Sequence, residues 1–557
     1  MRTGRLATVA WAPALLLALV WVAQIVLIWP AGDFPLNDDW SYGIAVQRLL
    51  AEGRFRPTDW TSMTLVAQVL WGALFCLPFG FSFEALRLST LTLGLAGVLA
   101  FYALLREVGT RPSLALLGSL TLATNPLYVH LACTFMTDVP FLALSIVALA
   151  EFVRHLRGGS PWCAIAGSVA AIGAMLIRQT AVVLPLAYAI ARLTQVPWRP
   201  RALLSALLPA ASCFALLAIF ERWLSVTNGL PALYRPAGFL AKGMIPSDPF
   251  DIAAHVVWML LVAGMYVGVF AIPVLAATWR GLVETPPEGP GWRFAPGALA
   301  LVIAALLGAT ALHHSWRMPL VPVAGNILYD LGLGPITLRD VFFLGRSDMH
   351  APRWLWIIVT TGGVAGVGLL AALVALAAQR CLHAAEDRPL LVLVIALIVL
   401  YAPTLLLHSF LDRYLLFLLP LVIVLVALVV GRSASWRGLV IGSIPSLLIF
   451  MTFGVAGTHD YFAWNRARWE LLAQLQRDGV SPAEIDGGFE FGGVRRYDRA
   501  RRPPPGKSWW WVDDDRYMLT LGPVDGYETF QSREFFRWLR LSESAVQVLK
   551  RTEAATR

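Results

Sequence analysis

Apolar runs of about twenty residues recur along this chain, separated by short gaps that contain many of its arginines. A helix that crosses the hydrocarbon core of a bilayer needs about 20 mostly apolar residues, and a helix pairs its backbone polar groups within the segment. The first run, residues 6–29, follows Arg2 and Arg5 and is longer than the roughly 7–15 residues of a signal-peptide core. We therefore expect an uncleaved first membrane helix.

The runs after residue 29 bring the predicted total to about thirteen spans. They are residues 84–105, 113–131, 139–156, 161–177, 180–194, 202–221, 254–279, 295–312, 353–378, 390–407, 414–431 and 438–456. Only 14% of all residues are charged, whereas about a quarter are charged in soluble proteins. One globular core cannot bury this much apolar surface, because such cores stop growing at about 250–300 residues. The predicted class is an all-α polytopic membrane protein.

The arginines in the short gaps predict the orientation of the spans, because short cytoplasmic loops are enriched in Lys and Arg. The pairs are Arg2/Arg5, Arg106/Arg111, Arg154/Arg157, Arg199/Arg201, Arg280/Arg293, Arg380/Arg388 and Arg432/Arg437. They share one side only if the apolar stretch 61–79 lies at the membrane interface and does not span. This assignment predicts a cytoplasmic N-terminus and an extracytoplasmic C-terminus. The net charge of +9 does not indicate nucleic-acid binding, because the basic residues do not gather on one soluble face.

The longer segments then lie on the outer side: residues 30–83, 222–253, 313–352 and 457–557. In the first of them, residues 41–52 alternate apolar and polar side chains as in an amphipathic surface helix. Residues 457–557 contain a helical stretch (464–477) and two strand-like runs (508–512 and 517–521). About 100 residues can form a small domain. We therefore expect a membrane core over residues 1–456 and a soluble α+β domain over residues 457–557.

Three acidic residues on the outer side are candidates for catalysis. Asp38 and Asp39 follow the first span, and adjacent carboxylates near a bilayer can include one with a raised pKa that acts as a general base. Their oxygens also suit a divalent cation. Asp138 begins a later span in the sequence Thr137-Asp138-Val139-Pro140. The structural alternative is the same for all three: each acid can cap the helix that follows it.

Two arginines at the outer ends of spans are candidates for binding phosphate. They are Arg178 and Arg413, and Tyr414 follows the second. A planar guanidinium matches phosphate oxygens and stays charged. The alternatives are an ion pair of Arg413 with Asp412, and extension of Arg178 to lipid head groups. In the tail, the basic residues around Pro503 fit a solvated loop, and Asp513-Asp514-Asp515 fits a turn between strands.

The order and common side of these motifs resemble the GT-C class of membrane glycosyltransferases, and specifically the bacterial relatives of protein O-mannosyltransferases and of the lipid A aminoarabinose transferase. The motifs are Asn37-Asp38-Asp39-Trp40-Ser41-Tyr42, Thr137-Asp138-Val139-Pro140, Arg178-Gln179 and Asp412-Arg413-Tyr414. The resemblance covers residues 1–460. Residues 460–469 and 486–490 also resemble the tails of bacterial members.

The resemblance implies transfer of a sugar from a polyprenyl-phosphate donor to a glycan, lipid or protein acceptor, at the outer face of the bacterial cytoplasmic membrane. It implies a catalytic base at Asp38 or Asp39 and a second acid at Asp138. It assigns the lipid phosphate and sugar to Arg178, Arg413 and Tyr414. The family has a lysine on the surface helices that this chain lacks, and Arg48 or Arg54 takes its place. The sequence requires no cofactor and leaves a divalent cation open.

Two other classes of protein compete with this interpretation. A transporter or flippase would show inverted repeats and polar groups deep in the spans. Here we find no repeat, and the candidate charges gather at one face. An assembly protein would use its tail to recruit a partner. Deleting residues 457–557 would abolish the function of an assembly protein and leave some transfer in an enzyme.

Overall fold

The computed structural model describes the chain with several gaps. The described residues are 3–197, 199–234, 249–284, 295–315, 353–383, 386–405, 412–430, 436–498, 511–539 and 541–552. The expected outer segment 313–352, all but three residues of which lie in a gap, therefore stays outside the description.

Long apolar helices dominate the described residues, which confirms the predicted class of helical membrane protein. Seven helices are long and apolar enough to cross a membrane, and up to nine segments qualify if each of two bent helix pairs counts as one span. Six of them lie in α1 (Thr3–Ile28), α4 (Phe83–Glu107), α7 (Asp138–Leu156), α10 (Pro200–Thr227), α15 (Arg353–His383) and α16 (Arg388–Leu405), and the seventh, Leu439–Arg477, combines a π-helix with α19 (Ile444–Arg477).

The total of about thirteen spans is not reproduced by this criterion, because four of the expected runs form shorter apolar helices. These are α8 (Pro161–Met175), α9 (Val183–Leu193) with the 3₁₀ turn η1 (Gln179–Val182), part of α13 (Ala295–Ser315), and α17 (Leu418–Val430) with the 3₁₀ turn η5 (Asp412–Phe417). The bent pairs are α5 (Pro112–Ala123) with α6 (Pro126–Ala132), and α11 (Pro249–Ala263) plus the π-helix η3 (Gly264–Val269) with α12 (Ile272–Glu284).

The bend between α5 and α6 has a local cause. The Asn125 side chain accepts hydrogen bonds from the amides of Leu127 and Tyr128 and so caps a new helix. Pro126 has no N–H to continue the helix that precedes it. The two helices meet at 61°. The chain is thereby redirected just before residues 133–137, which lead into α7.

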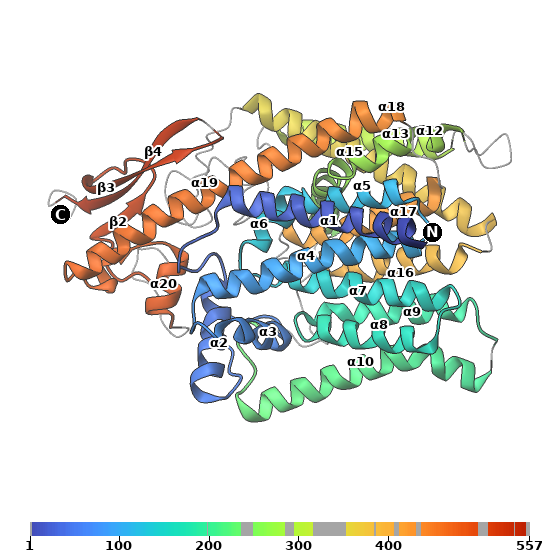
Figure 1. The fold of residues 1–557 in the computed structure, drawn as a ribbon. Helices are drawn as coiled ribbons and strands as arrows, with labels where there is room; N and C mark the ends of the chain where they lie inside the picture. Colours follow the sequence, from blue (N-terminus) through green and yellow to red (C-terminus); the bar gives the residue numbers. More distant parts are fainter. Residues whose placement is uncertain are drawn as a thin grey trace.

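Two short helices lie at one end of the bundle, in the segment that the sequence predicts to be interfacial. They are α2 (Asp39–Glu52) and α3 (Val66–Cys76), and α3 is too short to span a bilayer. The C-terminal sheet lies at this same end, and the N-terminus lies at the other (Figure 1). We call the end that contains α2, α3 and the sheet the polar end.

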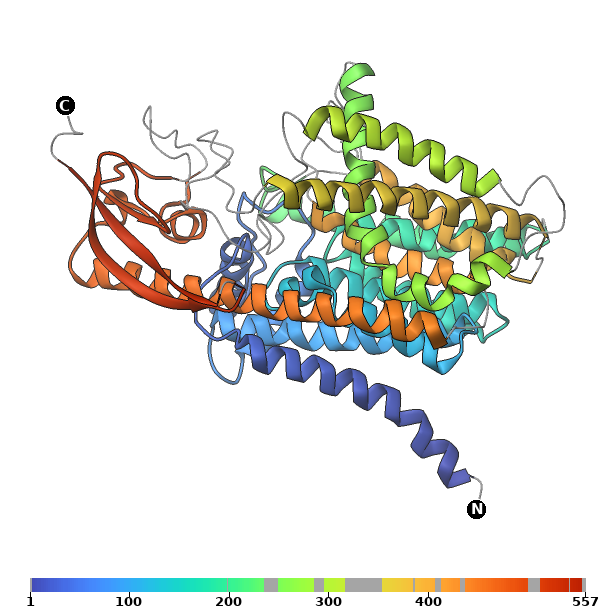
Figure 2. The same cartoon turned by 90° about the horizontal axis from the view of Figure 1, so that it is seen from above.

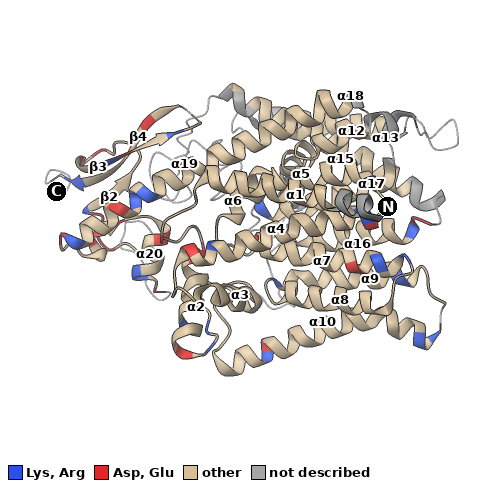
Figure 3. Ribbon diagram, viewed as in Figure 1, with Lys and Arg blue, Asp and Glu red and all other residues tan. Residues whose placement is uncertain are grey.

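Charged residues gather at the two ends of the bundle and in the C-terminal region (Figure 3). Two of the expected basic gaps meet at the end opposite the polar end, where Arg154 lies 3.0 Å from Glu107 and the Arg157 guanidinium donates to the carbonyl of Val108 at 2.7 Å. These gaps therefore share one side, as the charge pattern predicts.

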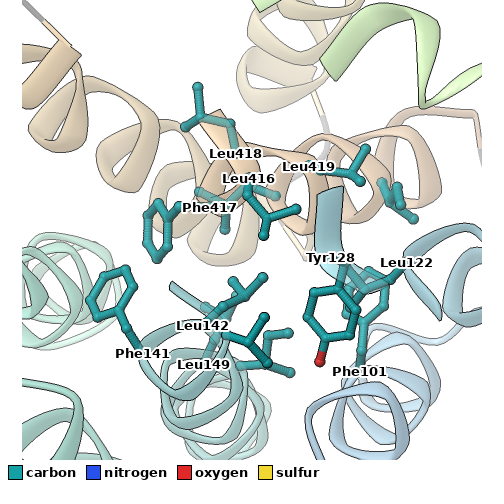
Figure 4. Packing of buried hydrophobic residues seen from close by; sticks show 14 of the residues in the cluster. Phe101, Leu122, Tyr128, Phe141, Leu142, Leu149, Leu416, Phe417, Leu418 and Leu419 are labelled. Carbon is teal, nitrogen blue, oxygen red and sulfur yellow. The ribbon is translucent and has the colours of Figure 1, made fainter. Parts of the chain in front are cut away.

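Between the ends, the core is packed by α4, α5, α6, α7 and α17 (Figure 4). The rings of Phe141 and Phe417 lie 5.4 Å apart, and Phe417 also packs on Tyr401 at 4.4 Å. Tyr128 donates to the carbonyl of Gly94 at 2.7 Å, which joins α6 to α4. The contact between Phe141 and Phe417 sets η5 beside the first turns of α7.

The C-terminal region is an α+β unit joined to the bundle by one continuous helix. After the π-helix η6 (Leu439–Ser443), α19 runs from the bundle to the sheet without a break (Figure 2). The sheet contains β1 (Ile485–Asp486), β2 (Tyr517–Thr520), β3 (Tyr527–Arg537) and β4 (Ser542–Arg551) in the order β1-β2-β4-β3. Only β1 and β2 pair in parallel. The expected domain boundary at 456/457 falls inside α19.

Sequence patterns located part of this unit. The predicted strand 517–521 corresponds to β2, whereas Trp511 and Val512 are not in a strand and residues 508–510 lie outside the description. Asp515 pairs with Arg551 at 2.8 Å, and Asp514 pairs with the same arginine. These acids therefore serve the sheet, as expected for a turn. The short helix α20 (Phe489–Arg496) completes the unit and faces α2.

Candidate active site

Asp38 lies in the loop between α1 and α2, where it contacts two side chains from distant parts of the sequence. Its Oδ1 accepts a hydrogen bond from Trp60 Nε1 at 2.8 Å, and its Oδ2 lies 3.4 Å from Arg413 Nη2. Asp38 occupies the N-cap position of α2, but its side chain makes no capping hydrogen bond. The Asp38 side chain is 21% exposed. Capping therefore does not account for this acid.

Asp39 is turned away from Asp38 and is completely buried. Its Oδ2 accepts the backbone N–H of Phe135 at 2.9 Å, which ties the start of α2 to the segment before α7. Burial raises the pKa of Asp39 to about 8, although the hydrogen bond from Phe135 acts against the shift. The carboxyl group is therefore mostly protonated at neutral pH.

Asp138 is the first residue of α7 and lies between two arginines. Its Oδ1 is 2.8 Å from Arg178 Nη2, and its Oδ2 is 3.7 Å from Arg413 Nε. Within the described residues neither carboxylate oxygen makes a well-directed hydrogen bond, so the contacts are ion pairs set by distance. The side chain is only 2% exposed. A buried carboxylate of this kind requires the two cations beside it.

Arg178 follows α8 and is buried, so it does not extend to lipid head groups. Its Nε donates to Thr137 Oγ1 at 2.7 Å. Its guanidinium lies 5.6 Å from the ring centroids of both Phe141 and Tyr414. Thr137 and Phe141 flank Asp138, so the first turn of α7 fixes this arginine on three sides.

Arg413 is the second residue of η5 and is buried as well. Arg413 connects the loop before α2 to the start of α7, because it contacts Asp38 on one side and Asp138 on the other. The expected alternative partner, the Asp412 side chain, lies outside the described residues. We refer to Asp38, Asp138, Arg178 and Arg413 as the charged cluster.

Of the two remaining candidates from the sequence, Tyr414 lies next to the charged cluster and Arg48 contacts other groups. Tyr414 lies against Arg178 and so borders the charged cluster. Arg48 has a different environment: its Nη1 donates to the carbonyl of Arg56 at 3.1 Å and of Pro57 at 3.5 Å, and desolvation lowers its pKa. These contacts stabilise the loop after α2. The described contacts of Arg48 do not include the charged cluster.

Two residues that support the site were not predicted from sequence. Trp60 donates to Asp38 from a loop whose sequence, Pro57-Thr58-Asp59-Trp60, gave no indication of this role. Arg87 is fully buried in α4 and donates to the carbonyls of Pro30, Gly32 and Phe34, which fixes the loop leading to Asp38. A lone arginine inside an apolar run is the signal that identifies it.

The described residues contain no group of three or more His, Cys, Asp or Glu side chains able to hold a metal ion. The arrangement of the charged cluster instead offers two buried cations and one partly exposed carboxylate. Cations of this kind stabilise developing negative charge. An exposed carboxylate beside them can accept a proton.

Residues 65–224 match the family model described as dolichyl-phosphate-mannose-protein mannosyltransferase. This segment is related to those mannosyltransferases. The match confirms the resemblance to membrane glycosyltransferases, and it includes Asp138 and Arg178 but not Asp38 or Arg413. No curated protein sequence matches this chain.

Two solved structures of ArnT from Cupriavidus metallidurans also align with the chain. One is bound to undecaprenyl phosphate; it is 15% identical, with a TM-score of 0.38 over 98% of each chain. The other is in the apo state; it is 15% identical, with a TM-score of 0.39 over 97% of this chain and 98% of that one.

Proposed function

We propose that this protein transfers a sugar from a polyprenyl-phosphate-linked donor to an acceptor hydroxyl or amine at the outer face of a bacterial cytoplasmic membrane. The observation that carries the proposal is the position of Arg413 between Asp38 and Asp138, at 3.4 and 3.7 Å. It joins the first loop, the start of α7 and η5 into one charged cluster. The matched family, whose name includes a sugar linked to a lipid phosphate, supports the same reaction class.

The two arginines of the charged cluster bind the donor phosphate in this proposal. Arg178 is held by Thr137 and Asp138, so its orientation is fixed before substrate arrives. Such preorganisation is effective because little reorganisation is needed as charge develops on the leaving group. Asp138 keeps both cations in place and balances part of their charge.

Asp38 is the proposed general base, since its side chain is far more exposed than that of Asp138 (21% against 2%). Asp39 is completely buried, and its Oδ2 holds the Phe135 amide. We therefore assign Asp39 to joining α2 to the segment before α7. We assign Asp138 to holding Arg178 and Arg413 in position, because it is paired with both of them.

The reaction is a direct displacement at the anomeric carbon. The acceptor O–H or N–H bond breaks and its proton moves to the Asp38 carboxylate. A bond forms from the acceptor atom to C1 of the sugar, and the bond from C1 to the phosphate oxygen breaks. The electron pair of that bond leaves with the polyprenyl phosphate, whose charge is stabilised by Arg178 and Arg413. Displacement from the opposite face inverts the anomeric configuration.

The location of the charged cluster suits a lipid-linked donor. Asp38 directly precedes α2, and the carbonyl of Ile177, the neighbour of Arg178, accepts the N–H of Leu65, which directly precedes α3. The charged cluster therefore lies at the polar end, which contains α2 and α3 (Figure 1). A polyprenyl chain can therefore stay in the bilayer while its phosphate reaches the arginines. The basic gaps at the opposite end support placing the polar end outside.

The test compares Asp38→Asn with Asp39→Asn in proteoliposomes. Donors are undecaprenyl-phosphate-linked hexoses and pentoses, the acceptor is a detergent extract of cell envelope, and the readout is acceptor-dependent release of undecaprenyl phosphate. We expect Asp38→Asn to lower the rate by about 10²–10⁴-fold, the usual contribution of a general base. Asp39→Asn is the matched control and retains activity within a few-fold. Wild-type rates in Asp38→Asn would remove the proposed base.

A flippase is tested in the same vesicles. A flippase moves the donor to the other leaflet and leaves the bond from sugar to phosphate intact. We expect free undecaprenyl phosphate and a glycosylated acceptor. Recovery of intact donor in the opposite leaflet, without any released lipid phosphate, would contradict transfer.

A further inference from the structure

The C-terminal unit contacts the residue that precedes Asp38. Glu490 of α20 accepts the backbone N–H of Asn37 on its Oε1 at 3.0 Å. Its Oε2 is paired with Arg468 Nη2 of α19 at 2.9 Å, and that arginine is buried and also donates to the carbonyl of Gly487. Asn37 has a positive φ of 54°, which is uncommon for a residue other than glycine. Glu490 therefore fixes a backbone turn directly beside Asp38.

The same unit also supports the side-chain partner of Asp38. The Trp60 ring lies 5.5 Å from the rings of both Phe489 and Trp511 and 6.2 Å from Trp40. Tyr497 lies 5.1 Å from Trp40 and 5.0 Å from Trp511. Three of these five rings come from the C-terminal unit and two from the segment around α2. We call this group the aromatic cluster.

The aromatic cluster is tightly packed around Trp40. A Cβ atom at Gly493 of α20 would lie 2.4 Å from the Trp40 ring, so only glycine allows α20 to approach α2 this closely. Trp40 is completely buried. Aromatic pairs in such geometry add about 0.5–1.5 kcal/mol each beyond the area they bury. The cluster therefore gives the Trp60 N–H a fixed direction toward Asp38.

We propose that Trp60 and Glu490 are positioning residues through which the C-terminal unit holds the Asp38 carboxylate in place for the reaction. The inference rests on the proposed function, since it takes Asp38 as the base. One residue fixes the backbone before Asp38 and the other fixes its Oδ1. The C-terminal unit is then part of the catalytic apparatus, although none of its residues touches the reacting atoms.

The first test removes the hydrogen bond to Asp38 but keeps the aromatic ring. Trp60→Phe loses the Nε1 donor, and we expect kcat to fall about 10-fold or more, because hydrogen bonds to charged groups are the stronger class. The donor KM stays the same, since the arginines are untouched. Trp71→Phe is the matched control: it also removes an indole N–H hydrogen bond, from Trp71 Nε1 to the carbonyl of Ser89 at 2.9 Å, but outside the aromatic cluster and away from Asp38.

A thermodynamic cycle separates positioning from general stability. In an Asp38→Asn background, Trp60→Phe has no carboxylate to orient, so we expect it to lower the residual rate less than twofold. Equal losses in both backgrounds would overturn the proposal. So would a kcat for Trp60→Phe that equals the kcat of Trp71→Phe.

The second test does not depend on activity. Glu490→Ala removes the acceptor for the Asn37 amide, and we expect hydrogen exchange at that amide to accelerate about tenfold or more in the full-length protein. Glu490→Gln retains Oε1 and restores most of the protection. Glu470→Ala is the control, because Glu470 lies on the surface of α19 and pairs with Arg533. In the Glu470→Ala variant we expect hydrogen exchange at the Asn37 amide to match that of the wild type.

The two proposals fail in different ways. Unchanged exchange at Asn37 in Glu490→Ala would overturn the link to the C-terminal unit, whatever the enzyme's activity. Full activity in Asp38→Asn would instead overturn the base assignment, and the exchange result would stand on its own. An inactive Asp38→Asn combined with wild-type kcat in Trp60→Phe and Glu490→Ala would overturn positioning alone.

Discussion

The first turn of α7 and the middle of the helix are both buried, yet they serve opposite purposes. Along most of its length the helix presents Ile146, Leu149 and Phe152 to apolar neighbours. Its first turn instead presents Asp138, and the nearest groups are the guanidiniums of Arg178 and Arg413. Burial therefore does not distinguish a structural residue from a functional one in this helix. The partner of each side chain does.

The difference follows from the cost of burying charge. An apolar side chain needs only close packing, which any neighbour of suitable shape provides. A buried carboxylate needs cations in fixed positions, and several segments must then converge on it. The polar end of the bundle is where α2, α7, η1 and η5 converge, so it is also where substrate charge can be accommodated.

The largest expected effect concerns Asp39, the second buried acid of the polar end. Its pKa is about 8 in the folded protein and about 3.8 when exposed. Above pH 3.8 the Asp39 carboxyl group loses its proton in the unfolded chain but keeps it in the folded protein. The free energy of unfolding therefore falls as the pH rises, and the stabilisation by the protonated Asp39 is lost by about pH 8. The change is on the order of 5 kcal/mol across this window.

Asp39→Asn should abolish that dependence, because the amide cannot ionise. We expect the Tm of the wild type in detergent to fall from pH 5 to pH 8.5 relative to that of the variant. Parallel profiles for the two proteins would show that Asp39 is ionised when folded. Such a result would remove the contrast between Asp38 and Asp39.

The next largest expected effect is the loss of stability when Asp138 is replaced. Asp138→Asn leaves two buried arginines without their shared counter-charge, and removing one partner of a buried pair costs about 3–5 kcal/mol. The matched control is Asp387→Asn, since Asp387 is paired with Arg157 at 3.8 Å and both are about one-third exposed. Exposed pairs contribute about 0–1 kcal/mol. Similar changes in Tm for the two variants would show that the buried pairs of Asp138 stabilise the protein no more than a partly exposed pair does.

Replacing Arg178 or Arg413 tests the charged cluster through the rate of sugar transfer. Arg178→Gln and Arg413→Gln should each lower the transfer rate by about 10²–10³-fold, the usual loss when one group that stabilises developing charge is removed. Arg48→Gln is the control, because Arg48 donates to loop carbonyls outside the charged cluster. A comparable loss in Arg48→Gln would mean that the phosphate site extends to α2.

Sequence patterns predicted the bundle well because membrane helices have a strong local signal. Length, apolarity and arginine pairs identified the class and the shared side of two basic gaps, and the position of α2 and α3 at the membrane interface stays a prediction. Asp38, Asp138, Arg178 and Arg413 stood out because charged side chains at the ends of apolar runs are costly and conspicuous. Their contacts then confirm that these four residues converge.

The remaining parts depend on contacts between distant segments, which have no local signal. Trp60 reaches Asp38 only because the aromatic cluster orients it, and nothing in its own loop predicts that. Arg48 resembled a phosphate ligand by sequence, but the turn after α2 offers it carbonyl partners closer by. The long strands β3 and β4 were also missed, because their exposed faces are charged and their pattern resembles a solvated tail.

The smallest expected effect lies in the apolar part of α7. Ile146 is buried in the core, and Ile146→Val removes one methylene group. Such a change costs about 0.5–1.5 kcal/mol, because the cavity relaxes only in part. The variant should therefore unfold slightly earlier in detergent at every pH, with kcat, donor KM and the pH profile unchanged. A change in KM or in the pH profile would show that packing along α7 affects the charged cluster, and the first turn and the apolar part of the helix would then act as one unit.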